Sequence, residues 1–127
     1  MKKCITALAI TLMLAGAAQA ELPSANDAVI RAALTSGKPT VIDLGARSCI
    51  PCKKMAPILE SLSGEYRNRA SVLFIDVHEN EDAAAKFRIQ MIPTQIFFDA
   101  KGKEIKRHVG FMNKAEILKD LKAAGLK

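Results

Sequence analysis

Residues 41–57 read VIDLGARSCIPCKKMAP, and the character of the chain changes within this stretch. Residues 40–44 form an almost continuous apolar run, which is typical of a strand covered on both faces, and Asp43 is the exception within it. After the two cysteines, apolar residues recur at the spacing of one helical face, at Met55, Ile58, Leu59, Leu62 and Tyr66. The stretch therefore predicts a strand and then a helix over about 49–66, with both cysteines at the junction.

Turn and cap signals extend this pattern in both directions. The helices are expected at 24–36, 49–66, 80–87 and 113–125, and the strands at 40–44, 72–77, 94–99 and 104–109. Ser24 is expected to cap the first helix, and Asn113 with Glu116 the last. A strand–helix–strand unit predicts two parallel strands, and the closing hairpin adds antiparallel ones. The sequence thus predicts an α/β fold with a four-stranded mixed sheet flanked by about four helices.

The composition is that of one compact domain. The chain has 127 residues, 50% of them apolar and 25% charged, so it holds enough apolar surface to exclude a disordered or low-complexity protein. Three cysteines are too few for a disulfide-dense mini-protein. A chain of this length favours a single domain.

Residues 1–20 have the three parts of a secretory signal peptide. Two lysines stand near the start, residues 5–18 are mostly apolar, and Ala18-Gln19-Ala20 is a small-residue cleavage motif. The apolar run is shorter than the about 20 residues that span a bilayer, which disfavours the alternative of an uncleaved membrane anchor. We therefore expect cleavage after Ala20, loss of Cys4 with the signal, a domain at 21–127 and a periplasmic location.

Cys49 and Cys52 are then the only cysteines of the exported domain, separated by Ile50 and Pro51. The first is expected at a helix N-terminus, where unpaired N–H groups and the helix dipole favour a thiolate, the species that attacks a disulfide. The second is expected one turn further on, close enough to attack the mixed disulfide and release the reduced substrate. Arg47 is expected to favour the thiolate further if its side chain points that way.

Three other roles for the cysteine pair remain open: a structural disulfide, half of a zinc site, and two inert thiols. A disulfide that closes so short a loop constrains little chain entropy. A zinc site would need further ligands, but there is no second cysteine pair, and His78 and His108 are isolated. Inert buried thiols are unusual in an oxidising compartment. Redox catalysis is therefore the favoured hypothesis.

Residues 41–57 resemble the active-site segment of the thioredoxin superfamily. Met91-Ile92-Pro93-Thr94 resembles the cis-proline loop of that superfamily, and Val109-Gly110 resembles its late glycine. The resemblance covers nearly all of 24–125, with these motifs at the family's spacing. It implies a thioredoxin fold, thiol–disulfide exchange and no bound cofactor. It also implies four strands, because the family's first strand is missing.

The resemblance also implies roles for single residues. Cys49 corresponds to the nucleophilic cysteine, and Cys52 to the resolving cysteine. Asp43 corresponds to the buried acid beneath Cys52, where burial raises the pKa of a carboxyl and allows proton exchange with the thiol. Pro93 corresponds to the cis-proline that faces the pair. The alternatives are an Asp43 held by backbone donors and an ordinary trans Pro93 that opens a strand.

Substrate contact is expected on two segments. These are Ile50 and Pro51 inside the cysteine motif, and Ile92, Pro93 and Thr94 in the proline loop. The backbone of Ile92 would pair with an extended substrate strand. Met91 either contacts the substrate, where a flexible side chain tolerates varied partners, or belongs to the core.

Three positions depart from the family pattern. Ser48 stands where the family has a tryptophan before the first cysteine, and Ile50 replaces a glycine. The lysine that lies near the buried acid in many thioredoxins falls on Val72, which leaves Asp43 without a cation. Together with export, these departures argue against the general thioredoxin role and against thioredoxin reductase as the partner.

We therefore expect an exported thiol–disulfide oxidoreductase that reduces protein disulfides, with apocytochromes c or misoxidised exported proteins as targets. Its electrons would come from a membrane thiol donor resembling DsbD or CcdA, because residues 97–102 and 110–112 also resemble the thioredoxin-like domain of DsbD-type proteins. The alternatives are a disulfide oxidase or isomerase, and a non-catalytic module that binds extended peptides beside Pro93. Loss of Lys2 and Lys3 with the signal lowers the net charge from +6 to +4, a mild basic balance that, together with export, predicts no nucleic-acid partner. The protein is expected to be a monomer.

Overall fold

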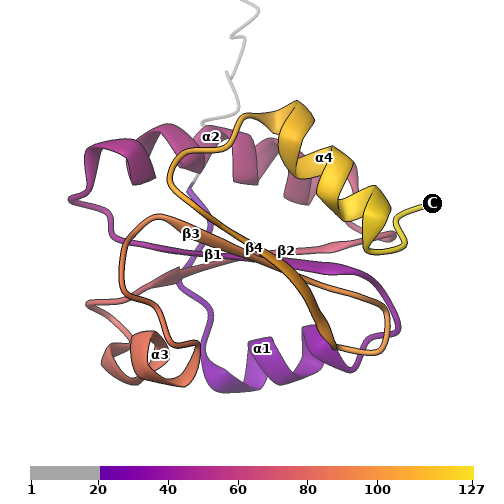
Figure 1. The fold of residues 1–127 in the computed structure, drawn as a ribbon, viewed down its shortest axis with the longest axis horizontal. Coiled ribbons are helices and arrows are strands. Elements are labelled where there is room, and N and C mark those ends of the chain that lie inside the picture. The colour runs from indigo at the N-terminus through magenta and orange to yellow at the C-terminus, as the bar shows by residue number, and fades with distance from the viewer. Residues whose placement is uncertain (1–20) are drawn as a thin grey trace, which may run out of the picture.

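The computed structural model describes residues 21–127, so the expected signal peptide at 1–20 lies outside the described residues. Within this range, helices and strands follow one another in the predicted order (Figure 1). The helices are α1 (Asp27–Leu34), α2 (Ile50–Glu65), α3 (Glu81–Lys86) and α4 (Lys114–Ala123). The strands are β1 (Thr40–Gly45), β2 (Ser71–Asp76), β3 (Thr94–Phe98) and β4 (Glu104–Val109).

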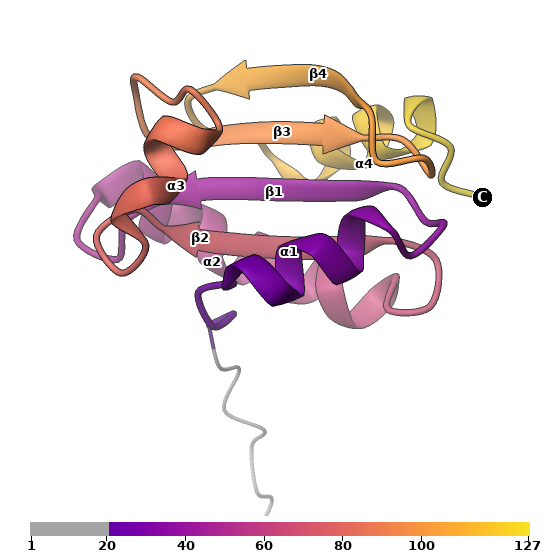
Figure 2. The ribbon, with the colours of Figure 1, turned by 90° about the horizontal axis from the view of Figure 1, so that it is seen from below.

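The four strands form one mixed sheet in the order β2-β1-β3-β4, which Figure 2 shows from one face. β1 runs parallel to β2, whereas β3 is antiparallel to both β1 and β4. This arrangement confirms the predicted mixed sheet. Along the outer edge of β2, Ser24 forms a single parallel bridge with Phe74, so residues 21–127 hold a bridge rather than a fifth strand at this edge.

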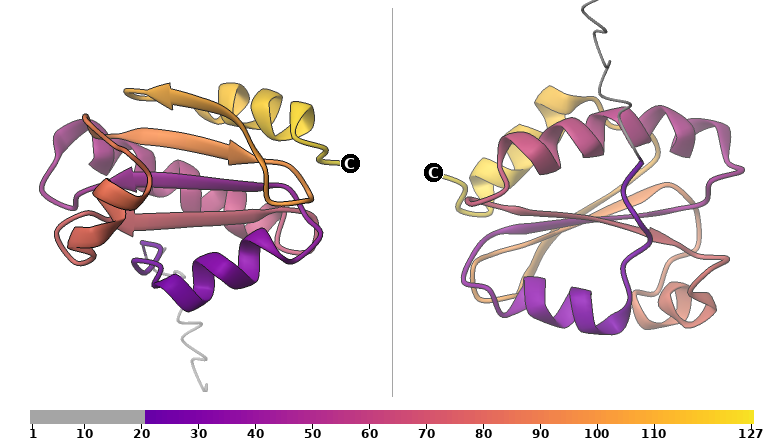
Figure 3. Two further views of the ribbon diagram at one scale, coloured as in Figure 1. Left: turned by 60° about the horizontal axis from the view of Figure 1, so that its bottom comes forward. Right: turned by 180° about the vertical axis from the view of Figure 1, so that it is seen from behind.

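Each face of the sheet is covered by two helices. α2 and α4 lie on one face, and α1 and α3 lie on the other (Figures 1 and 3). The core under α2 and α4 includes Val41 of β1 and Phe97 of β3, together with Met55, Leu59, Leu62, Ile117 and Leu121. Since side chains alternate along a strand, Asp43 and Gln95, two residues away from Val41 and Phe97, face α2 as well. The sheet thereby directs two buried polar side chains toward the helix that carries the cysteines.

The prediction that Ser24 caps the first helix is wrong. Asn26 is the N-cap of α1, and its side-chain oxygen accepts a backbone N–H at 2.9 Å. The hydroxyl of Ser24 instead accepts the backbone N–H of Asp76 at 2.9 Å, which ties the N-terminal segment to the end of β2. The prediction for the last helix is confirmed, because Asn113 and Glu116 form a capping box.

α2 is a helix of 16 residues that continues through Pro57. Met55, Leu59 and Leu62 are buried on its inner face, as the periodicity predicted. Among the helices of residues 21–127, none combines the length and the apolar character that crossing a bilayer requires.

Candidate active site

Cys49 and Cys52 are joined by a disulfide at the start of α2, with their Cα atoms 5.1 Å apart. Cys49 is the N-cap of the helix and is partly exposed, whereas Cys52 is only 4% exposed. Of the two sulfurs, that of Cys49 is therefore the one that a protein substrate can approach. Elsewhere in residues 21–127, no group of three or more His, Cys, Asp or Glu side chains is placed to hold a metal ion.

The start of α2 gives Cys49 the surroundings that favour a thiolate. Its Sγ accepts the backbone N–H of Cys52 at 3.4 Å. The first turn contains no acidic residue, and Pro51 occupies a position where the helix needs no N–H donor. In the dithiol form, the helix dipole and this N–H lower the free energy of the ionised sulfur relative to the thiol.

Gly45 lies directly under Cys52 at the end of β1, and the sequence analysis did not single it out. A Cβ atom on Gly45 would lie 3.1 Å from Sγ and 3.3 Å from Cβ of Cys52. A glycine in a strand often marks such a close approach, and that signal could have identified it. Asp43 precedes Gly45 by two residues on the same face, so it lies about 7 Å along the strand from the place where Cys52 rests.

Asp43 is fully buried on the α2 face of β1. The Nε2 of Gln95 donates to its Oδ1 at 2.8 Å, and its Oδ2 has no partner among the described residues. The alternative in which backbone donors hold Asp43 is therefore wrong. Burial raises the pKa of Asp43 to about 6, although the Gln95 hydrogen bond acts to lower it. This carboxyl changes its protonation state near neutral pH, as proton exchange with a nearby thiol requires.

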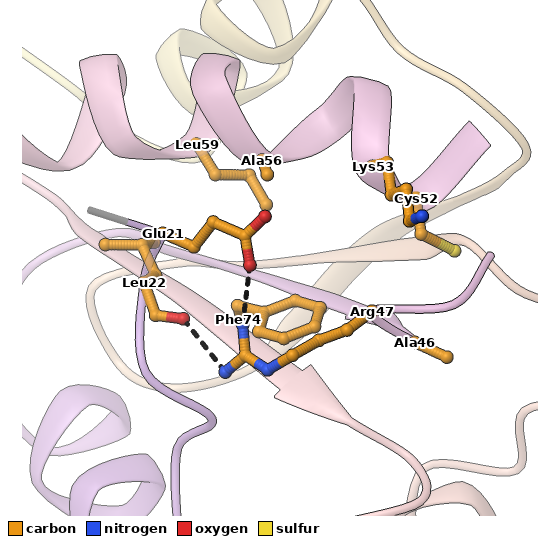
Figure 4. Close-up of a pocket in the computed structure, with 9 residues that line it drawn as sticks. All are labelled: Glu21, Leu22, Ala46, Arg47, Cys52, Lys53, Ala56, Leu59 and Phe74. Carbon is orange, nitrogen blue, oxygen red and sulfur yellow. Dashed lines mark hydrogen bonds and ion pairs between the residues drawn. The ribbon is translucent and has the colours of Figure 1, made fainter. Parts of the chain in front are cut away.

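Arg47 does not point toward the cysteines, so the condition under which it would favour the thiolate is not met. Its guanidinium pairs with the carboxylates of Glu21 at 2.9 Å and Glu79 at 3.2 Å. It also lies 5.2 Å from the centre of the Phe74 ring. Figure 4 shows the side chain directed away from Cys52 and toward the N-terminal segment. Arg47 thereby walls a pocket that reaches Cys52 and is also lined by Leu22, Ala56 and Leu59.

The proline loop precedes β3, and its Ile92–Pro93 peptide bond is cis, so the alternative of a trans proline is wrong. The hydroxyl of Thr94 donates to the carbonyl of Met91 at 2.7 Å and closes the loop. Within residues 21–127, the backbone N–H and C=O of Ile92 make no backbone hydrogen bond. Met91 is 65% exposed, which places it outside the core.

The cysteine motif and the proline loop meet at one end of the sheet. Leu44 lies opposite Thr94 in the pairing of β1 with β3, so the loop ends beside the last residues of β1. α2 begins just beyond that end, at the left of Figure 2. Ile50, in the first turn of α2, is 70% exposed. Two exposed apolar side chains, Ile50 and Met91, therefore belong to the end of the protein that carries the disulfide.

Comparison with known proteins agrees with this geometry. The sequence profile described as Thioredoxin matches residues 22–123. The chain belongs to the thioredoxin family. A thioredoxin of Staphylococcus haemolyticus is 44% identical over 81 residues, which cover 61% of this chain and 77% of that protein. A bifunctional thioredoxin reductase/thioredoxin of Mycobacterium leprae is 43% identical over 88 residues, which cover 69% of this chain but only 19% of that protein.

A solved structure supports the same conclusion for the fold. Chloroplastic thioredoxin z is similar to this chain with a TM-score of 0.70 and 29% identity, and the similarity covers 83% of this chain and 95% of that one. The predicted thioredoxin fold is thus confirmed. As a member of the thioredoxin family, the chain is a thiol–disulfide oxidoreductase, and its substrates are proteins that contain disulfides.

The surroundings of Asp43 differ from the thioredoxin pattern in the way that the sequence predicted. Its register partner on β2 is Phe74, and Val72 lies two residues before Phe74 on the same face. Both side chains are apolar, so β2 supplies no cation to the acid. Gln95 takes part instead, and the sequence analysis missed it, because its contact with Asp43 joins residues 52 positions apart.

Proposed function

We propose that this thioredoxin-family protein is exported and that it reduces disulfides of other exported proteins. The observation that carries the proposal is the pairing of a partly exposed Cys49 with a buried Cys52, on the sheet face that carries a carboxyl titrating near neutral pH. The basic start, apolar run and cleavage motif of residues 1–20 support export.

The first chemical step is the attack of the Cys49 thiolate on a disulfide of the substrate. A bond forms between Sγ of Cys49 and one substrate sulfur, and the substrate S–S bond breaks. The other substrate sulfur leaves as a thiolate and takes a proton from water. The helix N-terminus favours this step because it stabilises the thiolate at neutral pH.

The second step resolves the mixed disulfide. Cys52 loses its proton to Asp43, and its thiolate attacks Sγ of Cys49, so that the bond between Cys49 and the substrate breaks. The substrate leaves with both sulfurs reduced, and two electrons have passed from the dithiol to the substrate. Asp43 suits this role, because burial raises its pKa to about 6, close enough to neutral pH to take up and return a proton.

Substrate binding involves both segments at the reactive end. Ile50 and Pro51 are exposed beside the sulfur of Cys49, and the free backbone groups of Ile92 offer hydrogen bonds to an extended strand. Pro93 and Thr94 hold that backbone in place, since Pro93 is buried and the hydroxyl of Thr94 closes the loop.

The oxidised pair must be reduced again, and NADPH is not expected outside the cytoplasm. We therefore propose a membrane thiol donor resembling DsbD or CcdA. Suitable targets are the haem-binding cysteine pairs of apocytochromes c, or exported proteins with wrong disulfides. The short α3 of 6 residues favours reduction over oxidation, because oxidising relatives commonly carry a helical insertion in this part of the fold.

The reduction potential of the Cys49–Cys52 couple tests the direction of the reaction, by equilibration with glutathione or dithiothreitol. We expect a value near or below about −230 mV, in the range of reducing members. A value near about −120 mV would make the protein a disulfide donor and would refute the proposal. The C49S variant should lose reductase activity toward a model disulfide, and S48A, altered at the adjacent exposed position, should keep it.

Export has its own test. In a Gram-negative bacterial host, fractionation of cells that express the full chain should give a periplasmic protein whose N-terminal residue is Glu21. A chain without residues 2–20 should stay in the cytoplasm, while its reduction potential should equal that of the exported protein. Recovery of the full chain from the cytoplasm with residues 1–20 intact would refute export and leave the redox chemistry untouched.

A further inference from the structure

Gln95 is a fully buried amide in β3 that the chemistry above does not use. It lies directly opposite Asp43 in the pairing of β1 with β3, and both side chains face α2. Apart from the hydrogen bond between them, two oxygens of this pair, Oδ2 of Asp43 and Oε1 of Gln95, are buried without a partner among residues 21–127. Buried polar atoms nearly always have partners, so this pair needs an explanation.

Among the described residues, Gln95 is the hydrogen-bond partner of the Asp43 carboxyl, and the other side chains packed around Asp43 are apolar. Phe74 lies beside Asp43 on β2, and α4 covers this face with the apolar side chains of Ile117 and Leu121. The strands beside β1 and β3 carry Asp76 of β2 and Lys106 and His108 of β4 on this face, and Lys106 is paired with Asp120 of α4 at 2.8 Å. α2 carries charged side chains at Lys53, Lys54, Glu60 and Glu65. None of them contributes to the pKa of Asp43, which burial raises and Gln95 lowers.

Asp76 shows what stronger hydrogen bonding does to a buried carboxyl in the same sheet. It is 4% exposed, and the backbone N–H groups of Arg47, His78 and Glu79 donate to its carboxylate. Burial alone would raise its pKa, but these hydrogen bonds outweigh burial and lower it. Asp43 receives one uncharged donor instead of three, so burial prevails and the carboxyl can still be protonated near neutral pH.

We propose that Gln95 is a positioning residue for proton transfer: its amide holds Oδ1 of Asp43 and leaves Oδ2 as the atom that takes the proton of Cys52. The inference rests on the proposed role of Asp43. The amide of Gln95 gives the Asp43 carboxylate a hydrogen-bond donor, since β2 offers no cation there. This single uncharged donor does not hold the carboxyl in its ionised form. A proton on Oδ2 gives the pair one further donor, and Oε1 of Gln95 is the acceptor that lacks a partner.

The test is an NMR titration of the side-chain carboxyl carbon of Asp43 in the oxidised protein, in which the cysteines do not titrate. In Q95M, which keeps the length of the side chain and removes the amide, the midpoint should rise by about one pH unit, because the carboxylate loses its donor. In F97L, a packing change two residues along the same face, the midpoint should stay within about 0.3 units of wild type, well inside the shift expected for Q95M. An unchanged or lower midpoint in Q95M would overturn the proposal.

A second measurement needs no substitution. The side-chain N–H resonances of Gln95 in the wild-type protein should shift with the same midpoint as the carboxyl of Asp43, because the same hydrogen bond joins both groups. Resonances that stay constant through that titration would also overturn the proposal, even where Q95M failed to fold.

Kinetics separate this proposal from the role of Asp43 itself. The rate at which Cys52 resolves a mixed disulfide on Cys49 should fall in D43N, and in Q95M its dependence on pH should move upward with the midpoint of Asp43. If D43N resolved at the wild-type rate while Q95M still shifted the midpoint, the proposed function of Asp43 would be wrong. The contact with Gln95 would then shift the pKa of a carboxyl that takes no part in the reaction, and the positioning role of Gln95 would also be overturned.

Discussion

The contact between Gly45 and Cys52 predicts that G45A destabilises the oxidised protein more than the reduced protein. The backbone of Gly45 is in a conformation that alanine can adopt, so the effect of the substitution is steric. The new methyl group would lie 3.1 Å from Sγ and 3.3 Å from Cβ of Cys52, and 3.4 Å from the ring of Phe74. In the oxidised form the sulfur cannot move away, because it is bonded to Cys49.

The magnitude follows from two opposing effects. Overpacking of a buried site costs about 1–3 kcal/mol. Replacing glycine with alanine returns about 0.4–1 kcal/mol by restricting the unfolded chain. The oxidised form should therefore lose about 1–2 kcal/mol of unfolding free energy. In the dithiol form the side chain of Cys52 can rotate away from the methyl group, and a difference of about 1 kcal/mol between the two forms raises the reduction potential by about 20 mV.

Urea unfolding of both redox forms, together with equilibration against glutathione, measures these two quantities. The matched control is G64A, because Gly64 lies in α2 with nothing within 4 Å of an added Cβ. This control should gain about 0.5–1 kcal/mol equally in both forms and leave the potential unchanged. If G45A lost the same free energy in both forms, or if its potential became more negative, the steric reasoning would be refuted.

Three further predictions concern charge and capping. Above pH 6, D43N should have a free energy of unfolding higher than that of wild type by up to about 3 kcal/mol, because the folded protein binds the proton of Asp43 more tightly than the unfolded chain does. In urea unfolding, this difference should shrink as the pH falls from about 6 to 4 and be absent below about 4. R47Q should lose less than about 1 kcal/mol of unfolding free energy, because the ion pairs of Arg47 are solvent-exposed. The pKa of Cys49, followed by the ultraviolet absorbance of the thiolate, should not change in R47Q; a clear rise in that pKa would show that Arg47 does stabilise the thiolate. N113A should lose about 1 kcal/mol with an unchanged potential, and an unaltered unfolding midpoint would contradict the capping box.

The position of the cysteine pair between a strand and a helix was predictable because it depends only on residues that are close together in the sequence. An apolar strand, a cysteine pair and a helical period follow one another within residues 40–66, so each one indicates where the next begins. The burial of Asp43 was implied by the resemblance to the thioredoxin superfamily, because the apolar run by itself made this residue an exception. The order of the elements could be read for the same reason, from local periods and turns.

Contacts between distant segments were not predictable in this way. Ser24 and Asn26 are both suitable caps, and the choice between them depends on the N–H of Asp76, which binds Ser24. The direction of Arg47 depends on Glu21 and Glu79, which lie on two other segments of the chain. Neither pairing leaves a mark in the local pattern, because each requires the register and the packing of the whole sheet.

The contact between Asp43 and Gln95 depends both on a local pattern, which places Asp43 in a strand, and on the pairing of distant strands, which brings Gln95 beside it. The fold alone gives no reason for a carboxyl at this position, because ionising it in the folded protein at neutral pH costs about 3 kcal/mol relative to the unfolded chain. An apolar residue would pack on this face without that cost, as Val41 does two positions earlier. A cation, or several backbone donors such as those at Asp76, would remove the cost but would also hold the carboxyl ionised. A single amide donor is the arrangement that keeps the carboxyl buried and able to exchange a proton, on the same face of the strand whose Gly45 lies against Cys52.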